Sequence, residues 1–207
     1  MNVKEALAEL RKDENKRKFE QSVDLIVNLK GINMKKDNLN LVITIPHKIK
    51  EKKVCGFLTK KNDLVNSITL PEFDKYKDKA KLKKLVNEYD FFIAEAPLMP
   101  KVATVFGKVL GPVGKMPSPQ LGILPTDASD AVIKLTLTKI EKSIKIRMKE
   151  TSIKVISGKE KMSDDEISAN VSAIYKEIVN ALPNKQENVK NVMIKLTMTK
   201  PIKVEVK

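Results

Sequence analysis

Residues 192–199 read VMIKLTMT, and this stretch decides how the chain folds. Its apolar side chains recur at every second position, at Val192, Ile194, Leu196 and Met198. The polar side chains between them toward the C-terminal end are Lys195, Thr197 and Thr199. A period of two predicts a strand with one face against a core and the other against solvent. Such a strand needs partner strands and a covering layer, which other parts of the chain must supply.

A second half-buried strand is predicted near the N-terminus, over residues 19–29, ending at Gly31. Its apolar residues are Phe19, Val23, Leu25, Val27 and Leu29. A charged helix over residues 3–17 precedes it, and the polar loop 32–40 and a strand over residues 41–45 follow it. One helix and two strands do not make a complete domain on their own.

The C-terminal piece is incomplete in the same way. It contains predicted strands over residues 143–149 and 153–156, and a helix that Ser163 opens as the first residue of a capping box with Glu166. Pro183 ends that helix. Its apolar stripe is Ile167, Val171, Ile174, Ile178 and Leu182. Together the two terminal pieces would form one antiparallel sheet with helices on one face.

The middle of the chain has a different pattern, in which strands alternate with helices. Residues 90–95 (DFFIAE) predict a strand that is apolar on both faces, which is typical of a parallel sheet. Further strands are predicted over residues 54–58 and 67–70, and helices over residues 72–89, 98–106 and 126–140. A loop rich in glycine and proline is predicted over residues 107–125. The pattern indicates a small parallel α/β unit.

The sequence therefore predicts an α/β (α+β) protein of two domains. Residues 1–52 and 143–207 together make a discontinuous domain built on an antiparallel sheet. Residues 53–142 are inserted into it as the parallel α/β domain. The chain would cross between the domains twice, which makes a natural hinge.

The composition excludes several classes of function. The chain has 207 residues with one cysteine, Cys55, and one histidine, His47, which excludes an internal disulfide framework and a Cys/His zinc site. No run of 18 apolar residues would span a membrane, and the N-terminus has no apolar signal core. We therefore expect a soluble cytoplasmic protein without a metal or another cofactor.

The net charge of +14 predicts a polyanionic partner, with nucleic acid as the first candidate. A well-solvated lysine-rich surface is the alternative. The only arginines are Arg11, Arg17 and Arg147. Lysine meets phosphate as a point charge, whereas arginine reads guanine with two hydrogen bonds, so this composition favours recognition of backbone and shape. The charge is spread along the chain, and binding must come from a folded surface.

Two local features resemble functional sites, a phosphate-binding loop and a cluster of carboxylates, but their residues do not fit these functions. The loop Gly107–Pro117 (GKVLGPVGKMP) lacks the phosphate-binding pattern, because Val109 and Met116 stand where glycine and a hydroxyl residue are needed. A rigid surface turn is the alternative. The carboxylates of Asp164–Glu166 suit the start of a helix. No set of nucleophile, base and orienting residue is recognisable, so we expect no enzymatic activity.

The polar faces of the first and last strands carry a more specific pattern. The side chains on these faces are Lys18, Glu20, Ser22 and Asp24, and Lys195, Thr197 and Thr199. If the two strands are neighbours, these side chains form one patch. Lysines can neutralise phosphates, while hydroxyls and carboxylates can bond ribose 2′-OH groups, which distinguish RNA from DNA. The alternative is an ordinary solvent-facing sheet.

Three stretches resemble the L-one family of large-subunit ribosomal proteins, the proteins of the mobile ribosomal stalk. Residues 18–24 (KFEQSVD) are similar to the family's Lys-Phe-x-Glu-Ser/Thr-Val-Glu segment. Residues 107–117 are similar to its Leu-Gly-Pro-Arg-Gly-Lys-Met-Pro loop, and residues 196–199 (LTMT) to its Thr-Thr-Met-Gly segment. The stretches occur in the family's order, so the resemblance spans essentially the whole chain. The sequences of residues 28–32 (NLKGI) and 161–164 (KMSD) are similar to those of archaeal members.

The resemblance implies a split β-α-β domain that binds ribosomal RNA and an inserted Rossmann-like, three-layer domain that holds no dinucleotide. It implies a structural role in the large ribosomal subunit, where the protein binds the large ribosomal RNA at the mobile stalk. It further implies that the protein aids release of exit-site tRNA and represses translation of its own mRNA. We expect the protein to be bound to the ribosome, and to be a monomer when it is off the ribosome.

The resemblance and the polar face together give the candidate RNA contacts. These are Lys18, Phe19, Ser22, Asp24, Lys195, Thr197, Met198 and Thr199, with Lys108 and Lys115 as secondary contacts. Phe19 and Met198 fall on the apolar side of the alternation, which by itself predicts that they are core residues. Thr199 stands where the family has a glycine that lets RNA approach closely, and Val113 stands where it has an arginine.

Two other functions stay open at the level of the sequence. A basic α/β enzyme would need a catalytic set, which the residues do not show. A protein that binds nucleic acid without specificity would have equal affinity for any duplex. Binding to a stalk-type RNA and sedimentation with the large subunit distinguish these functions from the ribosomal one.

Overall fold

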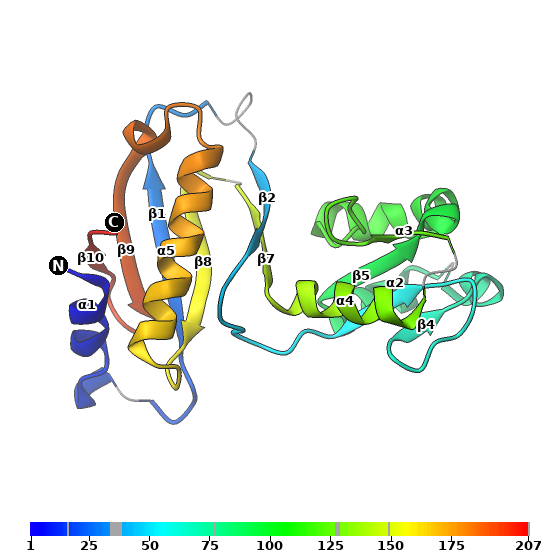
Figure 1. The fold of residues 1–207 in the computed structure, drawn as a ribbon, viewed down its shortest axis with the longest axis horizontal. Coiled ribbons are helices and arrows are strands. Elements are labelled where there is room, and N and C mark those ends of the chain that lie inside the picture. The colour runs from blue at the N-terminus through cyan, green and yellow to red at the C-terminus, as the bar shows by residue number, and fades with distance from the viewer. Residues whose placement is uncertain (16, 34–38, 77, 127–128, 149, 207) are drawn as a thin grey trace. The chain divides into compact units, whose positions relative to one another are not determined.

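The computed structural model divides into two compact units (Figure 1). The terminal unit comprises Met1–Ile49 and Lys142–Lys207, and the inserted unit comprises Lys50–Glu141. The structure describes residues 1–15, 17–33, 39–76, 78–126, 129–148 and 150–206. Most of the predicted loop 32–40, Asp127 near the predicted start of a helix, and the last residue of the predicted strand 143–149 lie outside these ranges.

A four-stranded antiparallel sheet in the order β10-β9-β1-β8 forms the centre of the terminal unit. Its strands are β1 (Ser22–Leu29), β8 (Ser152–Lys159), β9 (Val189–Leu196) and β10 (Ile202–Val204). The predicted first and last strands are neighbours, with Val23 opposite Leu196 and Leu25 opposite Ile194. Every second residue of β1 is buried, which confirms the alternation. The other face of the sheet carries the remaining side chains of each strand.

Two helices cover the buried face of this sheet (Figure 1). In α5 (Asp164–Ala181) the predicted capping box is confirmed, because the Ser163 hydroxyl accepts the N–H of Glu166 and the Glu166 carboxylate accepts the N–H of Ser163. Its predicted apolar stripe is buried throughout: Ile167, Val171, Ile174, Ile178 and Leu182. The second helix is α1 (Val3–Leu10), which begins with another capping box. Both helices share one apolar core with the sheet.

The first helix ends at Leu10, so the prediction of a helix to residue 17 is wrong. Residues 11–18 (RKDENKRK) contain no apolar side chain, and a helix with no face to bury is marginal in water. A short 3₁₀ turn, η1 (Asp13–Asn15), follows instead. Arg11 turns toward the start of α5, where its guanidinium lies 3.0 Å from an oxygen of Asp164.

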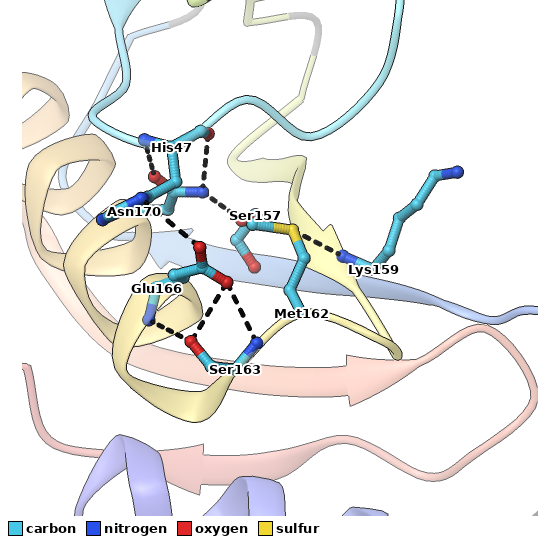
Figure 2. Close-up of polar contacts among 7 residues, drawn as sticks. All are labelled: His47, Ser157, Lys159, Met162, Ser163, Glu166 and Asn170. Carbon is cyan, nitrogen blue, oxygen red and sulfur yellow. Dashed lines mark hydrogen bonds and ion pairs between the residues drawn. The ribbon is translucent and has the colours of Figure 1, made fainter.

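Two further strands of the terminal unit, one before and one after the inserted unit in the sequence, pair as a two-stranded antiparallel ribbon, β2 (Asn40–Thr44) with β7 (Ser143–Arg147). The segment that follows β2 is fastened to α5 by one buried amide (Figure 2). The Asn170 side chain accepts the N–H of His47 and donates to the carbonyls of His47 and Ser157. This amide fixes the segment that follows β2 against α5 and β8.

His47 has an ionisable neighbour on α5. The Nδ1 atom of His47 lies 3.7 Å from an Oε1 carboxylate oxygen of Glu166 (Figure 2). The two residues are far apart in the sequence, and α5 brings them together. Because both side chains are about two-fifths exposed, the pair adds little to stability.

A parallel sheet in the order β4-β3-β5-β6 organises the inserted unit. Its strands are β3 (Val54–Phe57), β4 (Asn66–Ile68), β5 (Phe91–Glu95) and β6 (Ile123–Leu124). The central strand β5 is apolar on both faces, as predicted. Phe92 packs in one core cluster with Phe57 and Phe106, while Ile93 packs in a second cluster with Ile133. The chain starts in the middle of the sheet and adds strands on both sides, which is a doubly wound order.

The predicted helix over residues 72–89 is two elements. A 3₁₀ segment, η2 (Leu70–Tyr76), comes first, and α2 (Lys79–Glu88) follows. Asp78 separates them, because its carboxylate accepts the N–H of Ala80 and so acts as the N-cap of α2. Helix α4 (Asp130–Glu141) likewise begins later than the predicted residue 126.

The glycine-rich loop begins later than predicted, because α3 (Met99–Val113) continues through Gly107, Gly111 and Pro112. The buried residues of this helix recur every fourth position as Val102, Phe106 and Leu110. Their burial outweighs the low helix propensity of two glycines. Gly114, with φ +76°, ends the helix, and the N–H groups of Gly114 and Lys115 donate to carbonyls of its last turn. A short η3 (Ala96–Leu98) precedes α3, and η4 (Lys185–Asn188) precedes β9.

Candidate nucleic-acid interface

The beginning of β1 and the end of β9 lie side by side at one end of the terminal unit's sheet. The N–H of Ser22 donates to the Oγ1 of Thr197 over 3.0 Å. Asp24 lies directly opposite Lys195 in the same strand pair. Residues 175 positions apart in the chain are thus joined, and the structure brings together four of the predicted contacts at the sheet.

The predicted contacts Thr197, Met198 and Thr199 follow β9 as a turn, although the alternation predicts that the strand continues through them. The Thr199 hydroxyl accepts the N–H of Leu196 over 2.9 Å, and the Thr199 N–H donates to the Leu196 carbonyl over 3.2 Å. The threonine folds the chain back onto the strand end. A glycine at this position would lack the hydroxyl that makes the first of these contacts.

The prediction from alternation that Phe19 and Met198 are core residues is wrong. Phe19 is 51% exposed and Met198 is 60% exposed. Phe19 precedes the first residue of β1, and Met198 follows the last residue of β9, so the pleat of the sheet does not aim either side chain at the core. Two large apolar side chains at the surface, beside hydroxyl groups, can cover a ribose or a base.

Sequence reasoning missed Gln21, which is fully buried beneath this end of the sheet. Its side-chain oxygen accepts the N–H of Met198 over 3.2 Å, and its side-chain nitrogen donates to the carbonyl of Asn15 over 2.9 Å. A signal was present, because Gln21 is a polar residue on the same face as Val23 and Leu25. Buried polar groups are hydrogen-bonded, so a glutamine at a core position predicts a polar junction.

The helix-free face of the sheet carries the other side chains of its strands, including Asp24. Burial raises the pKa of the Asp24 carboxyl above its usual value, and the nearby Lys195 ammonium lowers it in part. The Asp24 carboxyl is therefore partly shielded from water and lies near the Lys195 ammonium. Such a group can accept hydrogen bonds from hydroxyl groups of a ligand that excludes water.

The terminal unit is electrically two-sided. The lysines that alternate with buried residues on the helix-free face are Lys154, Lys195 and Lys203. The acidic residues of α1 and α5 are Glu5, Glu9, Asp164, Asp165, Glu166 and Glu177, and the lysines of these helices are Lys4 and Lys176. The helices thus carry more acidic than basic side chains, whereas the sheet face carries these three lysines and Asp24, so the sheet face is the more favourable one for a polyanion.

The remaining predicted lysines lie in different settings. Lys18 is exposed just before β1, next to Phe19. Lys108 is exposed on α3 and belongs to the inserted unit. The ammonium of Lys115, in the same unit, donates to the carbonyls of Val86 and Tyr89 over 2.7 and 2.8 Å. Lys115 thus satisfies carbonyls at the end of α2, where a cation is favourable.

The arrangement supports binding and not group transfer. It offers ammonium groups, three hydroxyls, one carboxylate and two exposed apolar side chains at and beside the ends of one strand pair. In the described part of the chain, no group of three or more His, Cys, Asp or Glu side chains could hold a metal ion. No helix among the described residues is long and apolar enough to cross a membrane.

Comparison with known proteins identifies a ribosomal protein family over nearly the whole chain. The model described as "Ribosomal protein L1p/L10e family" matches residues 10–200. The large ribosomal subunit protein uL1 of Thermofilum pendens is 37% identical, over 98% of this chain and 90% of its own length. The protein of the same name from Archaeoglobus fulgidus is 34% identical over 96% and 95%, and that from Pyrococcus abyssi is 33% identical over 98% and 95%.

Proteins of this kind are structural, non-enzymatic components of the large subunit of the cytoplasmic ribosome, and binding of ribosomal RNA is general among them. The match covers both units and nearly the full length of several archaeal relatives. The chain therefore belongs to the ribosomal protein L1p/L10e family, as a member of its archaeal type.

Proposed function

We propose that the terminal unit is the RNA-binding domain of this ribosomal protein, and that it binds the large ribosomal RNA at the mobile stalk. The binding face comprises the start of β1, the end of β9 and the turn that follows β9. The observation that carries the proposal is the Ser22–Thr197 hydrogen bond, which joins the two predicted contact segments. Exposed Phe19 and Met198 flank this junction in the sequence.

Each kind of side chain on this face suits one part of an RNA strand. Lys18 and Lys195 neutralise phosphates, and they do so without regard to sequence. The Ser22 hydroxyl and the Asp24 carboxylate suit 2′-hydroxyl groups, which DNA lacks. Phe19 and Met198 offer apolar surface to a base or a ribose. The scarcity of arginine fits recognition of a folded RNA shape over reading of base edges.

The finer functions follow from the same face. We infer that the protein represses translation of its own mRNA when that message presents an RNA of the same shape as the ribosomal segment. We also infer that, on the ribosome, it aids release of exit-site tRNA. The inserted unit is proposed as a Rossmann-like domain without a dinucleotide, on which Lys108 is an exposed secondary RNA contact. Lys115, which the resemblance also implies, is engaged with α2.

A salt titration tests the RNA-binding proposal. The full chain is titrated with a stalk-type ribosomal RNA fragment and with a scrambled duplex of equal length, from low to high salt. The variant Thr197→Val removes the hydroxyl that accepts from Ser22. Thr138→Val is the matched control, because that threonine lies on α4, where its hydroxyl donates to the carbonyl of Lys134.

The proposal predicts that the intact chain prefers the stalk fragment by at least about 100-fold, because a specific site adds interactions beyond charge. Thr197→Val should lose most of that preference and Thr138→Val none of it. Equal affinity for both RNAs with the same steep salt slope would mean counterion release alone and would overturn the proposal. Repression is tested by translating the message in vitro, where added stalk fragment should relieve it by competition.

A further inference from the structure

We propose that Gln21 is a positioning residue for the RNA-binding face, and that its buried amide holds the Thr197–Thr199 turn in the shape that binds RNA. The inference rests on the proposed function of this face. Gln21 itself is fully buried, so it does not touch RNA. It acts through the turn, which carries three of the predicted RNA contacts.

The amide of Gln21 joins two segments that the sheet alone does not hold. Its Oε1 atom accepts the N–H of Met198 over 3.2 Å. Its Nε2 atom donates to the carbonyl of Asn15, at the end of the short turn after α1, over 2.9 Å. The chain before β1 and the chain after β9 are therefore tied together through one side chain.

The backbone of Gln21 is fixed as well, which makes the amide a firm anchor. Its N–H donates to the Glu160 carboxylate over 3.1 Å, and its carbonyl accepts the N–H of Glu160 over 2.9 Å. Glu160 directly follows β8. Gln21 is thus held by the strand on one side of β1 and holds the turn that follows the strand on the other side.

Two consecutive residues set the position of the turn. Ser22 donates its N–H to the hydroxyl of Thr197, and Gln21 accepts the N–H of Met198. The exposed Met198 side chain follows from this geometry, because its backbone is bound inward while the side chain points away from the core. Without Gln21, the Met198 N–H would lose its acceptor, and only the Ser22–Thr197 bond and the two bonds between Leu196 and Thr199 would hold the turn. The position of Met198 relative to Thr197 would then be less well fixed.

In this chain, position 21 faces one backbone N–H and one backbone carbonyl, so it needs a group that donates and accepts at once, although the family segment quoted above has glutamate here. An amide does both, a carboxylate only accepts, and a protonated carboxyl again does both. In the variant Gln21→Glu, the charged form loses the bond to the Asn15 carbonyl and places a charge at a fully buried position. We expect burial to raise the pKa of the new carboxyl, so acid favours its neutral form.

The test measures RNA affinity of the full chain at pH 8 and at pH 5 for the wild type, Gln21→Glu and Gln21→Ala. We expect Gln21→Glu to bind the stalk fragment at least about tenfold more weakly than the wild type at pH 8, because a buried bond is lost. At pH 5 it should come within about twofold of the wild type, because the neutral acid replaces the amide. Gln21→Ala should be weak at both pH values.

The charged groups around the site are present in every variant, so the wild-type profile accounts for them. They are Glu160 after β8, the ion pair of Glu20 with Lys159, and Asp24 with Lys195 on the neighbouring strands. The variant Asn188→Ala distinguishes a general loss of stability from a loss of the positioning role of Gln21. Asn188 is a buried amide at the opposite end of the sheet, where it donates to the carbonyl of Lys30 and accepts the N–H of Asn184. This variant should lose comparable stability and keep its RNA affinity.

Amide hydrogen exchange gives a readout that needs no RNA. The Met198 N–H should exchange at least about tenfold faster in Gln21→Ala than in the wild type, since its acceptor is gone. If the wild type prefers the stalk fragment but Gln21→Glu binds equally at both pH values, the positioning role is overturned. If the wild type shows no preference, the proposed function of the face fails, and the inference about RNA fails with it.

Discussion

The side-chain amide of Asn170 and the backbone of His47 bond to each other in both directions, over 3.0 and 3.1 Å. A third bond joins the same amide to the carbonyl of Ser157. We expect Asn170→Ala to lower the free energy of unfolding of the terminal unit by about 2–4 kcal/mol, because it leaves buried backbone groups without partners. Urea denaturation measures the loss. Asn180→Ala, an exposed position on the same helix, should change it by less than about 0.5 kcal/mol.

Gly158 predicts a second loss of stability, from steric overlap. A Cβ at residue 158 would stand 2.8 Å from the Cγ1 of Ile167, so β8 approaches α5 too closely for any side chain. Gly158→Ala should lower the unfolding free energy by about 1–3 kcal/mol. A double-mutant cycle with Ile167→Ala, which removes the opposing atom, should give a combined loss smaller than the sum of the two single losses.

Gly107→Ala makes the same change of glycine to alanine at a position with open space, so it serves as the control for Gly158→Ala. A Cβ there would meet nothing within 4 Å, and the residue lies inside α3. Alanine should therefore stabilise the inserted unit by about 0.5–1 kcal/mol, because it lowers the entropy lost when the helix forms. A loss of stability in Gly107→Ala, seen by calorimetry, would mean that this helix is not formed through residue 107 in solution.

Local patterns were sufficient for the elements whose partners are close in sequence or repeat regularly. The alternation over Val23–Leu29 predicted β1, and the stripe from Ile167 to Leu182 predicted α5 together with its capping box. These signals depend only on periodicity and on hydrogen bonds within one turn. The mixed α/β class follows from them.

The ends of elements and the polar junction could not be predicted so well, because distant residues determine them. Burial of Phe106 and Leu110 carries α3 through two glycines that indicated a loop. The strand β9 stops at Leu196 because Thr199 folds back on it, and this exposes Met198. The partners of Gln21 lie in segments that follow β8, α1 and β9, and no local pattern connects these segments.

Asp24 predicts how stability depends on pH. Burial raises its pKa in the folded protein, so the fold favours the protonated carboxyl. The contribution of Asp24 to the free energy of unfolding is greatest below the ordinary pKa of aspartate, near 4, where the carboxyl is protonated in both states. This contribution falls as the pH rises through the raised pKa of the folded protein. Asp24→Asn should therefore raise the melting temperature relative to the wild type at pH 7, and this advantage should vanish at about pH 3.5.

The same variant separates stability from function. Because the Asp24 carboxylate is proposed to accept bonds from 2′-hydroxyl groups, Asp24→Asn should bind RNA more weakly at pH 7 although it is more stable. Thermal scans across pH and binding titrations of one preparation test both halves. A variant that is less stable than the wild type at pH 7 would show that the Lys195 ammonium outweighs burial at this carboxyl.

The two-sided charge of the terminal unit predicts which lysines set the salt dependence of RNA binding. Lys18→Gln and Lys195→Gln each remove a cation from the proposed face, while Lys176→Gln removes one from the exposed side of α5. Removing a lysine that neutralises one phosphate should reduce the slope of log affinity against log salt by about 0.7–0.9. We expect that reduction for the first two variants and an unchanged slope for the third. Equal reductions of the slope in all three variants would mean that RNA binds over the whole surface of the terminal unit. The helix-free face would then not be the specific binding site.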